Sequence, residues 1–339
     1  MATIKKQRQS NIELLRIISM VLVMILHVNF FALDYPSAEE FNHTPISAFV
    51  RILFQIISIG SVNTFVLISG WFGIHSTLRG VKSLLFQCVF FFYGIFIVFF
   101  LLDMCNPTAK SLENILFFKS WFIQNYLILF FIAPAINMMI EKFGKKECAF
   151  SLLGLLAIEM VYDFFSFGER LFGAGYSALH FILLYMLAGY VRKYGTFKIM
   201  NRYPLIIFVT IVVAMTIVIY MGYSRGVAAV MRLNCYTNPL VIIASICLLL
   251  FFSKLKFQNT IINRIAKSVF AVYLVHTNMY LMGYYVRYAN KFYSDYSGVL
   301  YLFVMLVYLG AWFFASIGLD QIRIIIWNRI TQLKLFSKQ

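Results

Sequence analysis

The stretch LLRIISMVLVMILHVNF, residues 14–30, is almost pure hydrocarbon apart from Arg16 and His27. A bilayer core of roughly 30 Å is crossed by about 20 apolar residues in a helix, so this run reads as a membrane span. The rest of the chain has the same character: of its 339 residues 62% are hydrophobic and 12% are charged. Soluble domains carry about 25% charged residues. The composition therefore excludes an ordinary soluble domain and predicts an all-α polytopic membrane protein.

Apolar runs of spanning length recur along the chain, with short connections and no hydrophilic block large enough for a soluble domain. We expect about ten transmembrane helices, near residues 12–32, 48–71, 83–103, 121–140, 147–166, 177–194, 203–223, 237–254, 266–286 and 297–319. Residues 1–319 then form one membrane domain. Residues 320–339 mix apolar and basic side chains at helical spacing, which predicts an amphipathic, basic cytoplasmic tail on the membrane surface.

The positions of lysine and arginine predict the orientation of these spans. With the N-terminus inside, 20 of the 29 basic residues fall in inside segments and 7 in outside loops, while Arg16 and Arg51 lie within spans. Both termini are therefore expected in the cytoplasm, which implies a multi-pass protein of the cell (inner) membrane. This bias also accounts for most of the net charge of +16, so we expect no nucleic-acid partner.

Arg16 and His27 lie on one face of the first span. Eleven residues correspond to three helical turns plus roughly 20°, and to about 16 Å along the axis. A buried arginine costs on the order of 2.5–3.5 kcal/mol unless it reaches the interface or a polar cavity. Arg16 can snorkel and a lone histidine is often a packing residue, but the two together favour a polar cavity through the bundle. Glu13, one turn before Arg16, is placed to pair with it.

Glu159, near the middle of the fifth expected span, is a functional-site candidate because carboxylates are rare at that depth. It is placed either as a general base or as a group that sets the tautomer of His27. His180 and His276 are expected toward the extracytoplasmic side. They are candidates for the same site, or they hydrogen-bond a neighbouring helix.

The second expected span ends in a glycine-rich segment, residues 60–73, that permits close helix packing or a broken helix. Asn63, Ser69 and Trp71 place hydrogen-bond donors there, and donors beside a helix break suit a developing oxyanion. Packing explains the same residues equally well. The five cysteines show no CxxC spacing and no histidine pairing, so no metal site is expected.

Several stretches are similar to the acyltransferase-3 family of integral membrane acyltransferases. The family signature of an arginine, ten residues and a histidine matches Arg16 and His27 within NIELLRIISMVLVMILHVN. VNTFVLISGWF resembles the second-helix F-x-x-S-G segment, and HFILLYMLAGYVRKY fits the sixth-helix region. WFIQNYLILFFIAPAIN, with Trp121 and Tyr126, resembles the W-F-x-x-Y-L stretch, and SVFAVYLVHTN resembles the late I-Y-L-x-H element. The matching stretches run in order through most of the chain.

The resemblance implies a ten-helix enzyme that moves an acyl group, usually acetyl, from cytoplasmic acetyl-CoA to a hydroxyl of a cell-surface polysaccharide or lipid-linked glycan. His27 would be the catalytic histidine, as general base or as acyl carrier. Arg16 would be its cationic partner near the CoA end. We take as candidate substrate-binding residues Glu13, Asn63, Ser69, Trp71, Trp121, Tyr126, His180 and His276. The usual family aspartate is replaced by Glu13, and the basic stretch after the second helix is reduced to STLRGVK, with Arg79 and Lys82 as its only cations. Membrane lipid, acyl-CoA and glycan are the expected partners.

Two other classes remain compatible with the residues alone. A polysaccharide polymerase or flippase is also a basic, aromatic, many-span protein, although a polymerase would be expected to have a larger outer loop. A proton-coupled transporter would use His27 and Glu159 as a relay.

Overall fold

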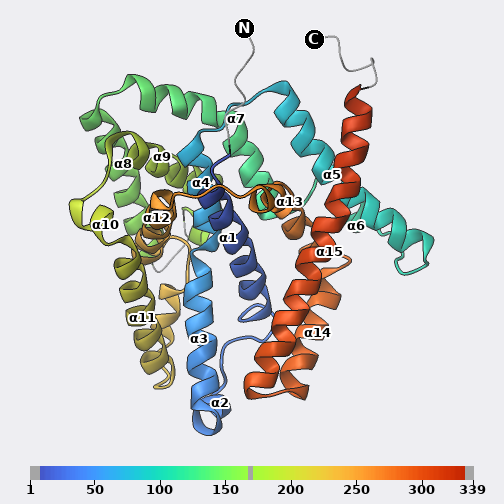
Figure 1. Ribbon diagram of the computed structural model, residues 1–339. Helices are drawn as coiled ribbons and strands as arrows, with labels where there is room; N and C mark the ends of the chain where they lie inside the picture. Colours follow the sequence, from blue (N-terminus) through green and yellow to red (C-terminus); the bar gives the residue numbers. More distant parts are fainter. Residues whose placement is uncertain (1–7, 167–170, 333–339) are drawn as a thin grey trace.

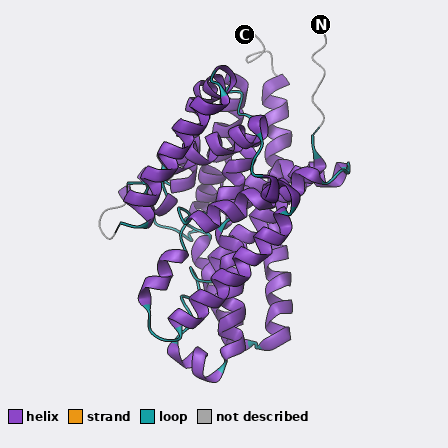
Figure 2. Ribbon diagram, turned by 90° about the vertical axis from the view of Figure 1, so that its left-hand side faces the viewer, coloured by secondary structure: helices purple, strands orange, loops and turns teal. Residues whose placement is uncertain are grey.

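The computed structural model describes residues 8–166 and 171–332, and this part of the chain contains helices and no strand (Figures 1 and 2). The helices are α1 (Ser10–Val28), α2 (Ala38–His43), α3 (Pro45–Ile59), α4 (Ser61–Phe72), α5 (Leu78–Leu101), α6 (Ala109–Leu116), α7 (Trp121–Lys142), α8 (Lys145–Glu159), α9 (Ala178–Tyr194), α10 (Lys198–Arg202), α11 (Pro204–Tyr223), α12 (Pro239–Lys254), α13 (Thr260–His276), α14 (Met282–Asp295) and α15 (Gly298–Gln332). Three short turns complete the described elements: the π-helix η1 (Met160–Phe164) and the 3-10 turns η2 (Gly173–Gly175) and η3 (Ala228–Leu233).

Within the described residues, six helical stretches are long and apolar enough to cross a membrane. They are Ser10–Val28, Pro45–Phe72, Leu78–Leu101, Ala109–Lys142, Pro204–Tyr223 and Gly298–Gln332, and Pro239–Lys254 is a shorter apolar helix. The described chain is therefore all-helical, and the protein is a multi-pass membrane protein. The number of ten spans stays a prediction.

Local sequence signals explain where many helices begin. Proline stands at the first turn of α3, α11 and α12, where its missing N–H costs nothing. Side chains also cap α9, α12 and α13: Ser177 accepts from the N–H of His180, Asn238 from that of Leu240, and Asn259 from those of Ile261 and Ile262.

Two expected boundaries are wrong because the chain turns or continues where the sequence suggested otherwise. The expected span 266–286 is not one helix, since α13 ends at His276 and α14 begins at Met282. The last helix does not end near residue 319 but continues to Gln332. Asp320 and Arg323 are buried in that continuation, where Asp320 accepts a hydrogen bond from Gln87 of α5. The remainder of the expected tail, 333–339, lies outside the described residues, and its place on the membrane surface stays a prediction.

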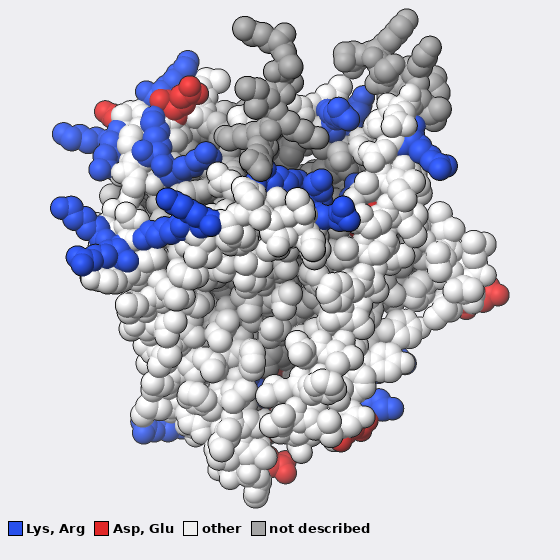
Figure 3. All heavy atoms as spheres, viewed as in Figure 1, with Lys and Arg blue, Asp and Glu red and all other residues white. Residues whose placement is uncertain are grey.

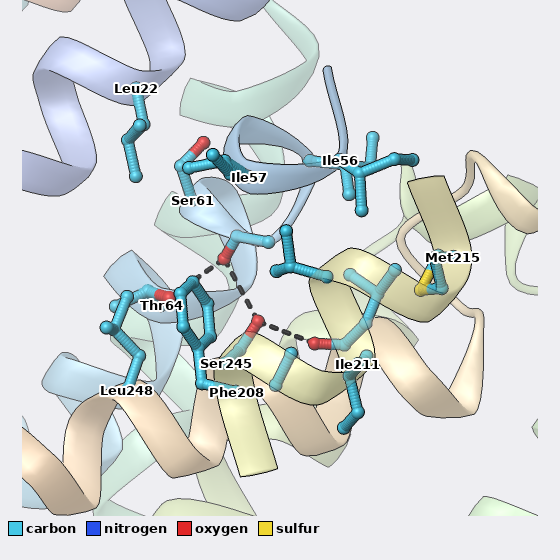
Figure 4. Close-up of a pocket in the computed structure, with 15 residues that line it drawn as sticks. Leu22, Ile56, Ile57, Ser61, Thr64, Phe208, Ile211, Met215, Ser245 and Leu248 are labelled. Carbon is cyan, nitrogen blue, oxygen red and sulfur yellow. Dashed lines mark hydrogen bonds between the residues drawn. The ribbon is translucent and has the colours of Figure 1, made fainter. Parts of the chain in front are cut away.

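The second expected span is broken at Gly60, between α3 and α4. The carbonyl of Gly60 accepts a hydrogen bond from Thr64 Oγ1 at 2.8 Å, and the hydroxyl of Ser245 lies 3.1 Å away (Figure 4). Side-chain hydroxyls of this kind satisfy backbone groups that a break would leave bare inside a membrane. The apolar cavity beside the break has a volume of about 10 Å³. It has room for at most one water.

Helix α1 occupies the middle of the bundle, in contact with α3, α4, α12 and α13 (Figure 1). Its residues Ile12, Leu15 and Met24 are fully buried. Both ends of the described chain point to the same side of the molecule in both ribbon views. Lysine and arginine gather on that side (Figure 3), in keeping with the expected cytoplasmic orientation.

Candidate active site

Two histidines from opposite ends of the sequence meet near the end of α1. His27 Nδ1 lies 3.0 Å from His276 Nε2, and the ring centroids are 5.1 Å apart. His276 is fully buried at the last residue of α13, whereas His27 is only partly buried. Helix α13 packs along α1, which brings these residues together although 249 positions separate them.

The hydrogen bonds around His276 determine which nitrogen of His27 is available. His276 Nδ1 lies 2.6 Å from the carbonyl oxygen of Val272, which only accepts, so Nδ1 must carry the proton. In a neutral His276 the other nitrogen, Nε2, is then an acceptor, and His27 Nδ1 donates to it. A neutral His27 therefore presents an unprotonated Nε2. Within the described residues no protein group hydrogen-bonds this nitrogen, which leaves it able to accept a proton.

Aromatic side chains fix the position of the two imidazoles. Phe31 meets His27 edge-on at 5.7 Å, and Tyr285 and Tyr273 lie 5.3 and 6.1 Å from His276. The Tyr285 hydroxyl also donates to the carbonyl of Met24 at 2.8 Å, which ties α14 to α1 one turn before His27.

A narrow apolar cavity lies along α1 between Arg16 and His27. It is lined by Met20 and Val23 of α1, Val62 and Phe65 of α4, Phe122 of α7, and Phe270 and Tyr273 of α13. Met20 and Val23 share a helix face with Arg16 and His27, as the helical repeat requires. The cavity measures about 20 Å³, close to the space of a single water. The structure therefore shows only a small apolar cavity here, and the polar cavity expected along the first helix stays a prediction.

The predicted pairing of Glu13 with Arg16 is confirmed. Glu13 Oε2 lies 3.3 Å from Arg16 Nε, without hydrogen-bond geometry, and Glu13 Oε1 accepts from Arg8 at 3.0 Å. Glu13 is buried, while the Arg16 side chain is 26% exposed at the end where the basic residues gather. Within the described residues, no hydrogen bond involves the terminal guanidinium nitrogens of Arg16.

Glu159 does not contact His27. It lies 2.6 Å from His180 Nδ1, and His180 Nε2 lies 3.1 Å from Asn63 Oδ1. Because the Asn63 amide nitrogen donates to the carbonyl of Tyr236, its oxygen faces His180 and must accept. One proton is shared between His180 and Glu159, so the fully buried pair is neutral as a whole. This pairing explains how a carboxylate is tolerated at this depth.

The remaining predicted residues lie in three places. Ser69 lies 3.3 Å from the Tyr126 hydroxyl, and the Tyr126 ring stacks on Phe122, which lines the cavity beside α1. Trp121 packs against Tyr176 and Tyr236. Trp71 is elsewhere, since its carbonyl accepts a hydrogen bond from Arg192 in the last turn of α9.

Sequence reasoning passed over a polar cluster that holds the loop after α1. Arg51, 5% exposed, donates to Glu40 at 2.6 and 2.7 Å and to the carbonyl of Leu33 at 3.1 Å. Burial raises the pKa of Glu40, but hydrogen bonds from Arg51, Tyr293 and the Ser37 N–H outweigh it and bring the pKa below its ordinary value. The signal in the sequence was Arg51 itself, an arginine inside an expected span.

Among the described residues, no three histidine, cysteine, aspartate or glutamate side chains come together as a metal site. The site is instead a protonable imidazole pair at the centre of a helical membrane bundle, with a cation at one end of the same helix. Such an arrangement defines a multi-pass membrane protein equipped for proton-transfer or acyl-transfer chemistry.

The family model described as an acyltransferase domain, that of the acyltransferase-3 family, matches residues 9–321. The chain belongs to this family, and the protein is an integral membrane acyltransferase. No curated protein and no solved structure matches the chain.

Proposed function

We propose that this acyltransferase moves an acetyl group from cytoplasmic acetyl-CoA to a hydroxyl of a cell-surface polysaccharide or lipid-linked glycan in the inner membrane. The observation that carries the proposal is the hydrogen-bond chain from the Val272 carbonyl through His276 to His27. This hydrogen-bond chain leaves His27 Nε2 as a positioned base at the end of the α1 face that also carries Arg16. The family assignment supports acyl transfer as the reaction.

In the proposed reaction, His27 Nε2 takes the proton of the acceptor hydroxyl as its oxygen attacks the thioester carbonyl carbon. The new C–O bond forms, the C–S bond breaks, and the proton on Nε2 passes to the departing thiolate to give the CoA thiol. His276 accepts from His27 Nδ1 throughout, so the ring keeps its orientation in both protonation states.

The donor is proposed to enter from the basic end of the molecule. The phosphates of CoA are anionic, and Arg16 offers guanidinium donors to them at that end. The acyl-bearing arm would follow the cavity lined by Met20 and Val23 toward His27. At about 20 Å³ this cavity must widen on binding, through movement of side chains such as Met20 and Phe65.

The test uses the purified protein in nanodiscs with acetyl-CoA that carries a radiolabelled acetyl group. A glycan fraction from the host envelope is the acceptor preparation, and succinyl-CoA and palmitoyl-CoA are competitors. We expect label to move to glycan with release of one CoA for each acetyl group, and the two other acyl-CoA species to compete weakly. A protein that transfers no label, or that prefers another acyl-CoA, contradicts the proposed donor.

The same experiment separates the base from an acyl carrier. A base leaves no label on the protein after rapid acid quench, whereas an acetyl-imidazole on His27 retains it transiently. Label that appears on the protein before it appears on glycan would replace the base mechanism with the covalent one.

A further inference from the structure

A second cavity, of about 220 Å³, lies where the loops before α9 and before α12 come together. Six of the residues that line it are Ile59, Ala174, Tyr176, Arg232, Asn234 and Tyr236. Pockets for drug-sized ligands measure roughly 300–1,000 Å³, so this one has room for a smaller, compact molecule. It differs from the cavity beside α1 because two tyrosines, an amide and a guanidinium line its walls.

Buried polar side chains hold the backbone of these walls in place. Asp163, fully buried in η1, accepts from the N–H groups of Phe172 and Ala174 at 3.0 and 3.2 Å. Its other oxygen accepts from the Thr237 hydroxyl at 2.8 Å. One carboxylate thus fixes both loops on either side of the cavity. Burying a carboxylate costs free energy that an apolar contact between the loops would not cost.

The hydrogen-bond chain Glu159–His180–Asn63 also holds the backbone of this wall. Asn63 donates to the carbonyl of Tyr236 at 2.9 Å, and His180 holds the Asn63 oxygen. Gly175 has a φ of +94°, and a Cβ there would overlap the side chain of Tyr236. The two loops therefore approach each other as closely as glycine allows, with Tyr236 locked between them.

Two tyrosines line one side of the cavity, and Trp121 packs behind them. Tyr176 and Tyr236 meet edge to face at 5.1 Å, and Trp121 contacts both, at 4.5 and 6.0 Å. Asn234 lies on the wall of the cavity, and a chain of hydrogen bonds connects it to the end of α1. Asn234 accepts from Gln55 Nε2 at 3.1 Å, and one of its two amide protons goes to the Tyr35 hydroxyl at 3.1 Å. Gln55 Oε1 accepts in turn from the amide of Asn29, at 3.4 Å, two residues after His27.

We propose that this cavity binds one pyranose unit of the acceptor glycan. A pyranose presents C–H faces that pack on aromatic rings and hydroxyls that pair with amide and guanidinium groups. The exposed ring of Tyr176 and the side chains of Asn234 and Arg232 match these features. The hydrogen-bond chain through Gln55 and Asn29 links the bound sugar to the end of α1 that carries His27. This assignment rests on the proposed acetyl transfer to glycan and identifies where the acceptor is held.

The test compares acceptor and donor kinetics of Asn234→Ala, Arg232→Gln and the cavity-filling Met231→Trp in the full-length protein. The acceptor is the envelope glycan fraction, and acetyl-CoA binding is measured separately by thermal shift. Arg225→Gln is the matched control, since it removes the same charge from an exposed position of the same connection between α11 and α12. We expect KM for glycan to rise at least 10-fold in the three cavity variants, with acetyl-CoA affinity unchanged and Arg225→Gln like wild type.

The outcomes separate the assignment from the proposed function. Wild-type transfer with a glycan KM that changes less than twofold in all three variants overturns the cavity assignment and leaves the proposed function standing. A wild-type protein that binds acetyl-CoA yet transfers no label to glycan overturns both. Unchanged acetyl-CoA binding in the variants shows that they are folded, so a raised glycan KM then reports the cavity itself.

Discussion

At the level of single residues, His276 is as important to the proposed chemistry as His27. A neutral histidine carries its proton on one of two ring nitrogens. A general base needs that proton fixed on one nitrogen, so that the other is free to accept. The Val272 carbonyl fixes the proton of His276, and His276 then fixes that of His27. The reactive nitrogen is thus determined by a residue that need not touch the substrate.

Replacing His276 tests this positioning role. His276→Phe keeps a ring but removes the acceptor for His27 Nδ1, and we expect kcat to fall about 10–100-fold, the range seen when the partner that orients a ligating histidine is lost. His276→Gln supplies a side-chain carbonyl and should recover part of that loss. The readout is label transfer at saturating acetyl-CoA, with KM for acetyl-CoA unchanged in both variants. Equal rates for the Phe and Gln variants would argue against positioning through this hydrogen bond.

Some residue-level features could be predicted from the sequence and others could not. The Glu13–Arg16 pair follows from helical spacing, because both residues lie on one helix. The contact between His27 and His276 depends on how α1 and α13 pack, which no local pattern encodes. Glu159 was a candidate partner of His27, but α8 packs on α9 and brings it to His180 instead.

At the level of elements, α4 and α9 pack closely around Gly70. A Cβ on Gly70 would overlap the carbonyl oxygen of Tyr185 and lie 2.9 Å from its Cα, and these backbone atoms cannot move aside cheaply. We expect Gly70→Ala to destabilise the protein by about 1–3 kcal/mol, the usual cost of overpacking. Thermal unfolding in nanodiscs measures the change.

Gly94→Ala is the control for this substitution. No atom would lie within 4 Å of a Cβ at Gly94 in α5, and alanine favours a helix over glycine by up to about 1 kcal/mol. Its unfolding temperature should equal or exceed that of the wild type. If the two variants unfold alike, the packing of α4 on α9 differs from the one described.

The cluster around Glu40 predicts a pH dependence of the loop after α1. Its folded pKa lies below the ordinary value of 4.5, so its stabilising effect is complete above that value and is lost as the pH falls through the folded pKa. Glu40→Gln removes the charge. We expect the wild type to unfold at higher temperature than Glu40→Gln at pH 7, and the difference to shrink below about pH 4.5. A difference that is constant from pH 7 to pH 3.5 would refute the ion pair as its cause.

Element types were easier to predict than element ends. The runs that became α5, α7 and α11 each contain a long, mostly apolar stretch, so their helical spans follow from hydropathy. The break at Gly60 and the turn after His276 depend on side-chain hydroxyls and amides that satisfy the backbone there, such as Ser245 and Thr277. Those partners come from tertiary packing or from the local turn, and hydropathy does not reveal them.

At the scale of the whole molecule, the concentration of lysine and arginine at one end predicts the orientation in the membrane. Single cysteines at Lys198 and Ser294, both exposed, probe the two ends. Cys105 is replaced by serine in both variants, since the other four native thiols are buried. We expect a membrane-impermeant maleimide to label the Ser294→Cys protein in intact cells and the Lys198→Cys protein only after lysis. The reverse pattern would invert the proposed topology.

The proposed donor path, the proposed base and the proposed acceptor cavity all lie within one helical bundle. The basic end, the cavity beside Met20 and Val23 and the imidazole pair follow one another along α1. A hydrogen-bond chain through Asn29, Gln55 and Asn234 joins the end of α1 to the cavity between the loops before α9 and α12. Such an order suits a reaction whose donor is cytoplasmic and whose acceptor is on the far side. It also explains why α1, with both Arg16 and His27, lies at the centre of the helices.

The most direct test of the account is the rate of labelled acetyl transfer to glycan by His27→Gln and by His43→Gln. His43 is exposed in α2, so its substitution controls for the loss of a histidine as such. We predict that His27→Gln loses about 10²–10⁴-fold in rate, the contribution of a general base, and that His43→Gln matches the wild type. A His27→Gln protein that transfers acetyl groups at the wild-type rate would contradict the central role of His27.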